Sequence, residues 1–181
     1  MTWGRWFLAG LVAGAAALAV VFWRGADAET VVTDFAAIVE SATVRRPHAA
    51  IFSIDTVTLA GESRRGIAAA GASRVAWDVV PADRQWVDVA IGLREQAWTS
   101  EANAVLFRVG LSYDGHYEDL VARVIDPSRD AGDRGWVPVR IDLSPYGGRA
   151  VSLIFNTAPA PGMPSTHVHA ALWGEPRIVQ R

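Results

Sequence analysis

The stretch WVPVRIDLSPYGGRAVSLIF, residues 136–155, decides the fold of this chain. Apolar residues alternate with other residues on both sides of a central break, which is the period-2 pattern of strands with one buried face. The break, SPYGG at residues 144–148, combines a proline with two glycines that tolerate a positive φ. The stretch therefore predicts two strands, joined by a turn, whose apolar sides face one core.

Similar strand patterns recur along the chain after residue 47. Residues 85–93 alternate cleanly, and residues 104–113 begin apolar at both parities, as in a central strand of a sandwich. Asp114-Gly115 is a strong signal for a hairpin turn. Turn-forming residues separate the runs, so the sequence predicts an all-β sandwich domain over residues 47–181.

The residues around the break also resemble a known family. Trp136, Ile-Asp-Leu-Ser at 141–144, Tyr-Gly-Gly-Arg at 146–149 and the strand at 151–157 look like the penultimate hairpin of galactose-binding-like jelly rolls. Many carbohydrate-binding modules belong to these β-sandwiches. The segment ALWGEPRI at 171–178 resembles the last strand of the same fold. The resemblance covers residues 47–180 and implies a jelly-roll β-sandwich, but sugar binding must be argued from a site because this fold hosts many functions.

Length and composition narrow the possible functions. The 181 residues allow one domain plus an appendage. The formal net charge is −2, so the chain lacks the excess of basic residues that marks a nucleic-acid-binding protein. The chain has no cysteine, which excludes disulfides, thiolate metal sites and cysteine nucleophiles.

Residues 1–28 predict a single transmembrane helix that precedes the β-sandwich. The segment 7–22 is apolar and uncharged, and with its margins it approaches the ~20 residues that span a bilayer. Tryptophans suited to the membrane interface flank it: Trp3, Trp6 and Trp23. Ala26-Asp27-Ala28 has the small-x-small form of a signal-peptidase site, so a cleaved signal peptide is the competing interpretation. The signal-like start favours a cytoplasmic N-terminus and a β-domain in the periplasm or outside the cell.

The predicted helix carries small residues that suit helix packing. Gly10 and Gly14 form a Gly-x-x-x-Gly spacing that permits close approach of another membrane helix, although glycine is also common in ordinary anchors. Residues 29–46 then predict a stalk or linker. A short amphipathic helix and a strand across residues 30–33 are both compatible with its pattern.

Two groups of residues are candidates for a metal site. His167 and His169 stand two apart on a predicted strand and would share a face. In the loop 126–135, Asp126, Asp130 and Asp133 offer oxygen ligands that could hold a structural Ca²⁺. Jelly rolls of the resembled family often hold such an ion near a loop. Neither group completes a ligand motif, so solvated polar side chains are the simpler interpretation, and we expect no other cofactor.

Four aromatic residues are candidate platforms for a sugar ring: Trp86, Trp98, Trp136 and Tyr146. Aromatic faces can stack on the apolar side of a pyranose while neighbouring polar side chains take its hydroxyl groups. The alternative is that these rings pack the edges of the sandwich.

Catalytic motifs are missing from the sequence. There is no G-x-S-x-G nucleophile motif. Glu118 and Asp119 are adjacent on a predicted strand, so they point to opposite faces and cannot form a facing acid–base pair. We therefore expect a protein that is not an enzyme.

Two functions remain after these exclusions. The small-residue face of the predicted helix favours an accessory subunit of a membrane protein assembly, with other membrane proteins as partners. The alternative, suggested by the family resemblance, is a carbohydrate-binding module at the cell surface or in the periplasm.

Overall fold

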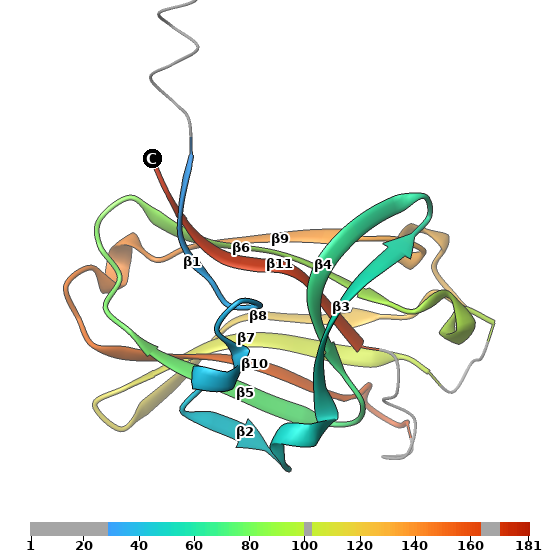
Figure 1. Ribbon diagram of the computed structural model, residues 1–181. Coiled ribbons are helices and arrows are strands. Elements are labelled where there is room, and N and C mark those ends of the chain that lie inside the picture. The colour runs from blue at the N-terminus through green and yellow to red at the C-terminus, as the bar shows by residue number, and fades with distance from the viewer. Residues whose placement is uncertain (1–28, 100–102, 164–170) are drawn as a thin grey trace, which may run out of the picture. The chain divides into compact units, whose positions relative to one another are not determined.

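The computed structural model describes residues 29–99, 103–163 and 171–181. In these residues the chain forms two antiparallel sheets (Figure 1). The first sheet has six strands in the order β3-β4-β11-β6-β9, with β1 pairing beside β11, and the second has five in the order β2-β5-β10-β7-β8. The predicted all-β class is confirmed.

The strands are short, and the only helical elements among the described residues are 3-10 turns in some of the connections. The first sheet is built from β1 (Thr30–Asp34), β3 (Phe52–Leu59), β4 (Glu62–Ala69), β6 (Gln85–Leu93), β9 (Val137–Asp142) and β11 (Ala171–Gln180). The second is built from β2 (Val44–Arg46), β5 (Ser73–Val79), β7 (Val105–Tyr113), β8 (His116–Ile125) and β10 (Val151–Pro159). The 3-10 turns are η1 (Val39–Ser41), η2 (Ala49–Ile51), η3 (Glu95–Ala97), η4 (Ala131–Asp133) and η5 (Ser144–Tyr146).

Aromatic rings from both sheets meet in the core. Trp173 of the first sheet has its ring centroid 5.0 Å from that of Phe107 and 4.9 Å from that of Phe155, both of the second sheet. All three side chains are almost completely buried. Burial of each large apolar side chain contributes roughly 1.5–3 kcal/mol, so this cluster helps to hold the two sheets together.

The two strands of the opening stretch form as predicted, but they do not pair in a hairpin. β9 pairs with β6 in the first sheet, whereas β10 pairs with β5 and β7 in the second. The turn η5 therefore carries the chain from one sheet to the other. The alternation specified which side chains face the core, and that requirement is met equally by a hairpin and by a crossing between sheets.

The segment predicted as a stalk, residues 29–46, belongs to the sandwich from Val31 onward. β1 pairs with β11 and β2 pairs with β5. Between them, Phe35 is fully buried with its ring centroid 4.6 Å from that of Trp77. Asp34 accepts the backbone N–H of Ala36, which favours a turn over a regular helix. The strand alternative is therefore correct, and the domain starts earlier than the predicted residue 47.

The predicted anchor, residues 1–28, lies outside the described residues, together with Trp3, Trp6, Trp23, Gly10 and Gly14. Within residues 29–99, 103–163 and 171–181, no helix is long and apolar enough to cross a membrane. The anchor stays a prediction.

Candidate functional site

One tryptophan lies across the outer face of the first sheet. Trp136 directly precedes β9, and its Nε1 donates a hydrogen bond of 2.9 Å to the carbonyl oxygen of Glu62, at the start of β4. A Cβ placed on Gly174 of β11 would lie 2.7, 3.0 and 3.0 Å from three atoms of the six-membered ring of the indole. The ring therefore rests directly on Gly174, and only glycine leaves room for it.

Small residues continue on both sides of Gly174. Gly66 of β4 and Ala90 of β6 are its partners across the sheet. Neighbouring strands lie about 4.8 Å apart, so three strands in succession expose almost no side chain at this level of the face. The sheet surface is consequently low enough for a large ring to lie against it.

An apolar patch surrounds the indole. Leu59, Ala68 and Leu172 are buried on this outer face, and Trp98 and Trp136 both pack against them. The Nε1 of Trp98 donates a hydrogen bond of 2.8 Å to the carbonyl oxygen of Leu93, which fixes its ring beside the strand end. The structure thus brings two of the four predicted aromatic residues to one patch.

A row of ion-paired side chains, which we call the ladder, runs along the same face. Arg64 contacts Glu62 at 2.5 Å and Glu175 at 3.1 Å. Arg177 lies 3.9 Å from Glu175 and 3.0 Å from Asp88. These groups are partly exposed, so each retains hydrogen-bonding capacity toward solvent or a ligand.

A second ion pair lies beside the patch. Arg94, just after β6, reaches Asp55 of β3, with Nη2 and Oδ2 at 2.5 Å. The hydrogen bond from Arg94 is the main reason why the pKa of Asp55 is lowered. Asp55 and Arg64 also border a narrow gap beside the Trp136 ring that is too small to admit a water molecule. A carboxylate and a guanidinium therefore stand at the edge of this half-buried apolar patch.

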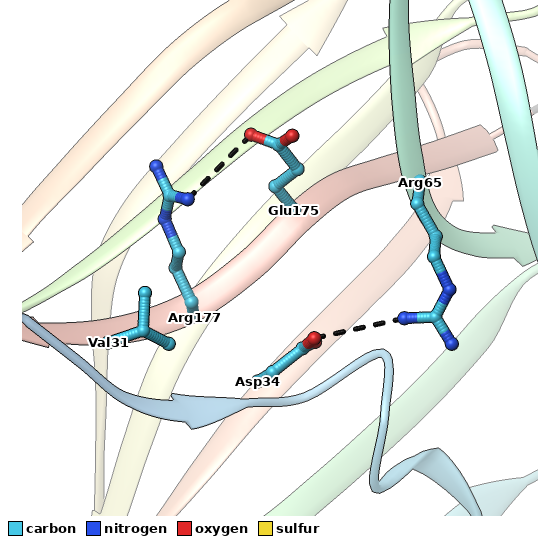
Figure 2. Close-up of a pocket in the computed structure, with 5 residues that line it drawn as sticks. All are labelled: Val31, Asp34, Arg65, Glu175 and Arg177. Atoms are coloured by element: carbon cyan, nitrogen blue, oxygen red, sulfur yellow. Dashed lines mark ion pairs between the residues drawn. The ribbon is translucent and has the colours of Figure 1, made fainter.

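The ladder ends at a polar pocket of about 210 Å³ (Figure 2). It is lined by Val31, Asp34, Arg65, Glu175 and Arg177. The pocket forms where β4 stops pairing with β11 at Gly174 and β11 bulges before Arg177. Arg65 and Asp34 approach to 3.8 Å across this opening, and Figure 2 shows them coming from different strands.

The other two predicted aromatic residues lie elsewhere. Trp86 is on the same sheet face, near the opposite end of β6, and the Arg140 guanidinium covers its ring at 5.2 Å from the centroid. Tyr146 lies in η5, where its hydroxyl donates a 2.9 Å hydrogen bond to Glu118 and its ring centroid is 5.9 Å from that of Tyr113. Burial, together with Glu118, raises the pKa of Tyr146 to about 12.

The carboxylates of the loop 126–135 are engaged by the loop itself. Asp133 is buried and accepts the backbone N–H of Asp126 at 2.7 Å, while Arg123 approaches its other oxygen at 3.3 Å. Asp130 accepts the backbone N–H of Gly132.

No cluster of three or more His, Asp or Glu side chains that could hold a metal ion occurs in the described part of the chain. His167 and His169 lie outside it. The metal set of these two histidines with Asp126 and Asp130 stays a prediction.

The sequence did not reveal which charged side chains lie on the same face as Trp136. Asp55, Arg64, Arg94 and Glu175 come from segments that are far apart in the chain. One signal was present, because a glycine inside a strand, such as Gly174, often marks a close approach of another group.

Comparison with known proteins gives one partial sequence relative. No family model matches the chain. An uncharacterised protein of Archaeoglobus fulgidus is 38% identical over 90 residues, which is 49% of this chain and 22% of the relative. The chain therefore spans about a fifth of the length of that relative.

Two solved structures share the architecture. The family 51 carbohydrate-binding module (CBM51) of Clostridium perfringens GH95, in complex with methyl-galactose, has a TM-score of 0.56 at 15% identity, covering 84% of this chain and 100% of the module. The structure of the CBM51-2 and INT domains of Clostridium perfringens ZmpB has a TM-score of 0.50 at 14% identity, covering 86% and 30%.

This likeness shows the fold and confirms the expected β-sandwich of the carbohydrate-binding-module kind. By architecture, this protein is a two-sheet β-sandwich similar to carbohydrate-binding modules.

Proposed function

We propose that this protein binds a carbohydrate on the outer face of the first sheet, with Trp136 as the stacking platform. The observation that carries the proposal is the position of the indole, which rests on Gly174 beside partly exposed carboxylates and guanidinium groups. The likeness to carbohydrate-binding modules supports it at the level of the fold.

Each part of the face has a role in this proposal. The apolar face of a pyranose would stack on the indole, where C–H groups and an aromatic ring make favourable contact. Asp55 would accept hydrogen bonds from sugar hydroxyl groups, and Arg64 and Arg94 would donate to them. Because ion pairs already hold these side chains, little rotamer freedom is lost on binding.

The charges on this face indicate a neutral sugar. The carboxylates in the ion pairs described above are Asp55, Glu62, Asp88 and Glu175, and their guanidinium partners are Arg64, Arg94 and Arg177. The two kinds alternate and nearly balance, so the face offers no excess charge to an ionic ligand. Since one similar module was solved with methyl-galactose, galactosides are the first ligands to test.

The test is glycan binding by the full chain in mild detergent, measured by calorimetry with methyl-galactose and galactan. We expect Trp136→Ala to weaken binding about tenfold or more, because a lost stacking contact of about 1.4 kcal/mol corresponds to a factor of ten. Asp55→Asn keeps the shape of the side chain and should weaken binding by removing one charged acceptor.

Tyr146→Phe is the matched control, because Tyr146 lies beyond the opposite end of β9 and loses only its bond to Glu118. It should bind like the unmodified chain. If Trp136→Ala and Asp55→Asn both keep full affinity while remaining folded, this face is not the sugar site.

We also propose that residues 1–28 anchor the chain in a membrane and place the sandwich in the periplasm or outside the cell. The support is the length of the apolar run and its flanking tryptophans. A sugar-binding domain held there would meet extracellular or cell-wall polysaccharides.

A further inference from the structure

The outer face of the second sheet carries its own exposed aromatic ring. Tyr117 of β8 is 49% exposed. A Cβ placed on Gly110 of β7 would lie 2.7 Å from the Tyr117 hydroxyl oxygen and 2.9 Å from its Cε2. The phenol therefore rests on a glycine of the neighbouring strand, and the Trp136 ring likewise rests on a glycine of the first sheet. Its hydroxyl donates a hydrogen bond to Asp119, which fixes the ring in place.

Arginines stand in register beside this ring. Arg46 of β2 is directly opposite Arg74 of β5, and Arg74 is opposite Asn156 of β10. Asn156 is in turn opposite Arg108 of β7. Directly paired residues share a face of the sheet, and strands lie about 4.8 Å apart. Three guanidinium groups and one amide therefore form a row across four strands, which we call the arginine row.

The arginine row has few anionic partners of its own. Arg46 and Arg74 are exposed and make no ion pair with any residue in the described ranges. Arg108 approaches Asp119 only to 3.9 Å, and its buried Nε has no hydrogen-bond partner. The Tyr117 ring rests on Gly110, which is two residues from Arg108 on the same face of β7, so the arginine row lies near the ring.

We propose that the arginine row, with Tyr117, binds an acidic polysaccharide that carries carboxylate or sulfate groups. Guanidinium groups pair with such anions through two parallel hydrogen bonds, and Asn156 can donate to a sugar hydroxyl between them. Tyr117 would stack on a pyranose ring. This site goes beyond the neutral-sugar site of the first sheet and uses none of its residues.

The arrangement favours a sparsely charged polymer over nucleic acid. Duplex DNA carries one negative charge per ~1.7 Å, so a site for it needs a dense basic surface. Here Asp119 lies in the row next to the arginine row and Asp78 lies in the row after that, and both would repel a continuous line of phosphates. An acidic polysaccharide, with its charges separated by whole sugar units, can place them on the arginines alone.

The test measures binding of the full chain in mild detergent to polygalacturonate and to chondroitin sulfate at low salt, because both carry about one anionic group per sugar unit. Arg74→Gln/Arg108→Gln should weaken binding about tenfold or more, and added salt should weaken binding of the unmodified chain. Arg84→Gln/Arg129→Gln is the matched control, because it removes the same net charge from two loops. It should retain most of the affinity.

Two results would overturn the proposal. One is an equal loss of polysaccharide affinity in the two double variants, which would mean that binding depends only on the net charge of the protein. The other is tighter binding of duplex DNA or of anionic vesicles than of either polysaccharide. Trp136→Ala should leave polygalacturonate binding unchanged, and Arg74→Gln/Arg108→Gln should leave galactan binding unchanged. The proposal for each site can therefore be contradicted without affecting the proposal for the other.

Discussion

Trp136 and Tyr117 are positioned by the same local device on the two outer faces. Each ring lies over a glycine of another strand of its own sheet, Gly174 or Gly110, and each is tied by a hydrogen bond from its own polar atom. A side chain at either glycine would push the ring away from the sheet. The position of each ring therefore depends on two residues, the aromatic one and the glycine beneath it.

The environments of Tyr117 and Tyr146 predict how the stability of the protein depends on pH. Burial, together with Asp119, raises the pKa of Tyr117 to about 12, and Tyr146 is raised to about 12 by burial and Glu118. The unfolded value is about 10. Below pH ~10 both states are protonated, whereas between ~10 and 12 the unfolded state loses its protons first. Stability should therefore fall as the pH rises through this window.

Absorbance of the ionised phenol measures this titration directly. The chain has only three tyrosines, so the contribution of each one can be followed. Tyr117→Phe should remove one of the groups that titrate near 12. The prediction is wrong if Tyr117 ionises near 10 while circular dichroism still reports native structure.

At the residue scale, the sequence could identify Trp136 but not its surroundings. It was one of the four aromatic residues that the sequence offered as platforms for a sugar ring. Its neighbours Asp55, Arg94 and Glu175 come together only through the strand order β3-β4-β11-β6. A period-2 pattern states which face a side chain occupies, but it does not state which strand lies alongside.

At the element scale, β1 and the turn that follows it close one side of the core. Phe35→Ala should lower the free energy of unfolding by about 3–5 kcal/mol, because its ring is fully buried against Trp77 and Phe155. Urea unfolding of the full chain in detergent measures the change. Ile38→Ala is the control, since Ile38 is 39% exposed and should lower stability much less. Equal effects would mean that the segment is not part of the core.

The misplaced domain boundary has a physical explanation. Residues 30–46 contain a five-residue strand, a 3-10 turn and a three-residue strand, which are too short to give a clear period. Longer strands such as β6 and β9 alternate over six to nine residues and were located correctly. Strands this short cannot be recognised from the alternation of apolar residues, which is why the start of the domain was predicted too late.

At the scale of the whole molecule, the predicted anchor determines where the sandwich works. We expect the full chain to remain in the membrane fraction after carbonate extraction, and a chain lacking residues 1–28 to become soluble. Proteolysis of intact cells or spheroplasts should degrade the sandwich from outside. A soluble product that begins at Glu29 would instead establish a cleaved signal peptide.

The stacking of two sheets around one core has a consequence for assembly. The outer surfaces of the sheets point away from each other, so occupying one leaves the other open. A molecule that binds a neutral glycan on one face and an acidic glycan on the other would cross-link two polymers. Mixing it with both polysaccharides at once would then produce a cross-linked network, which neither polysaccharide alone would form.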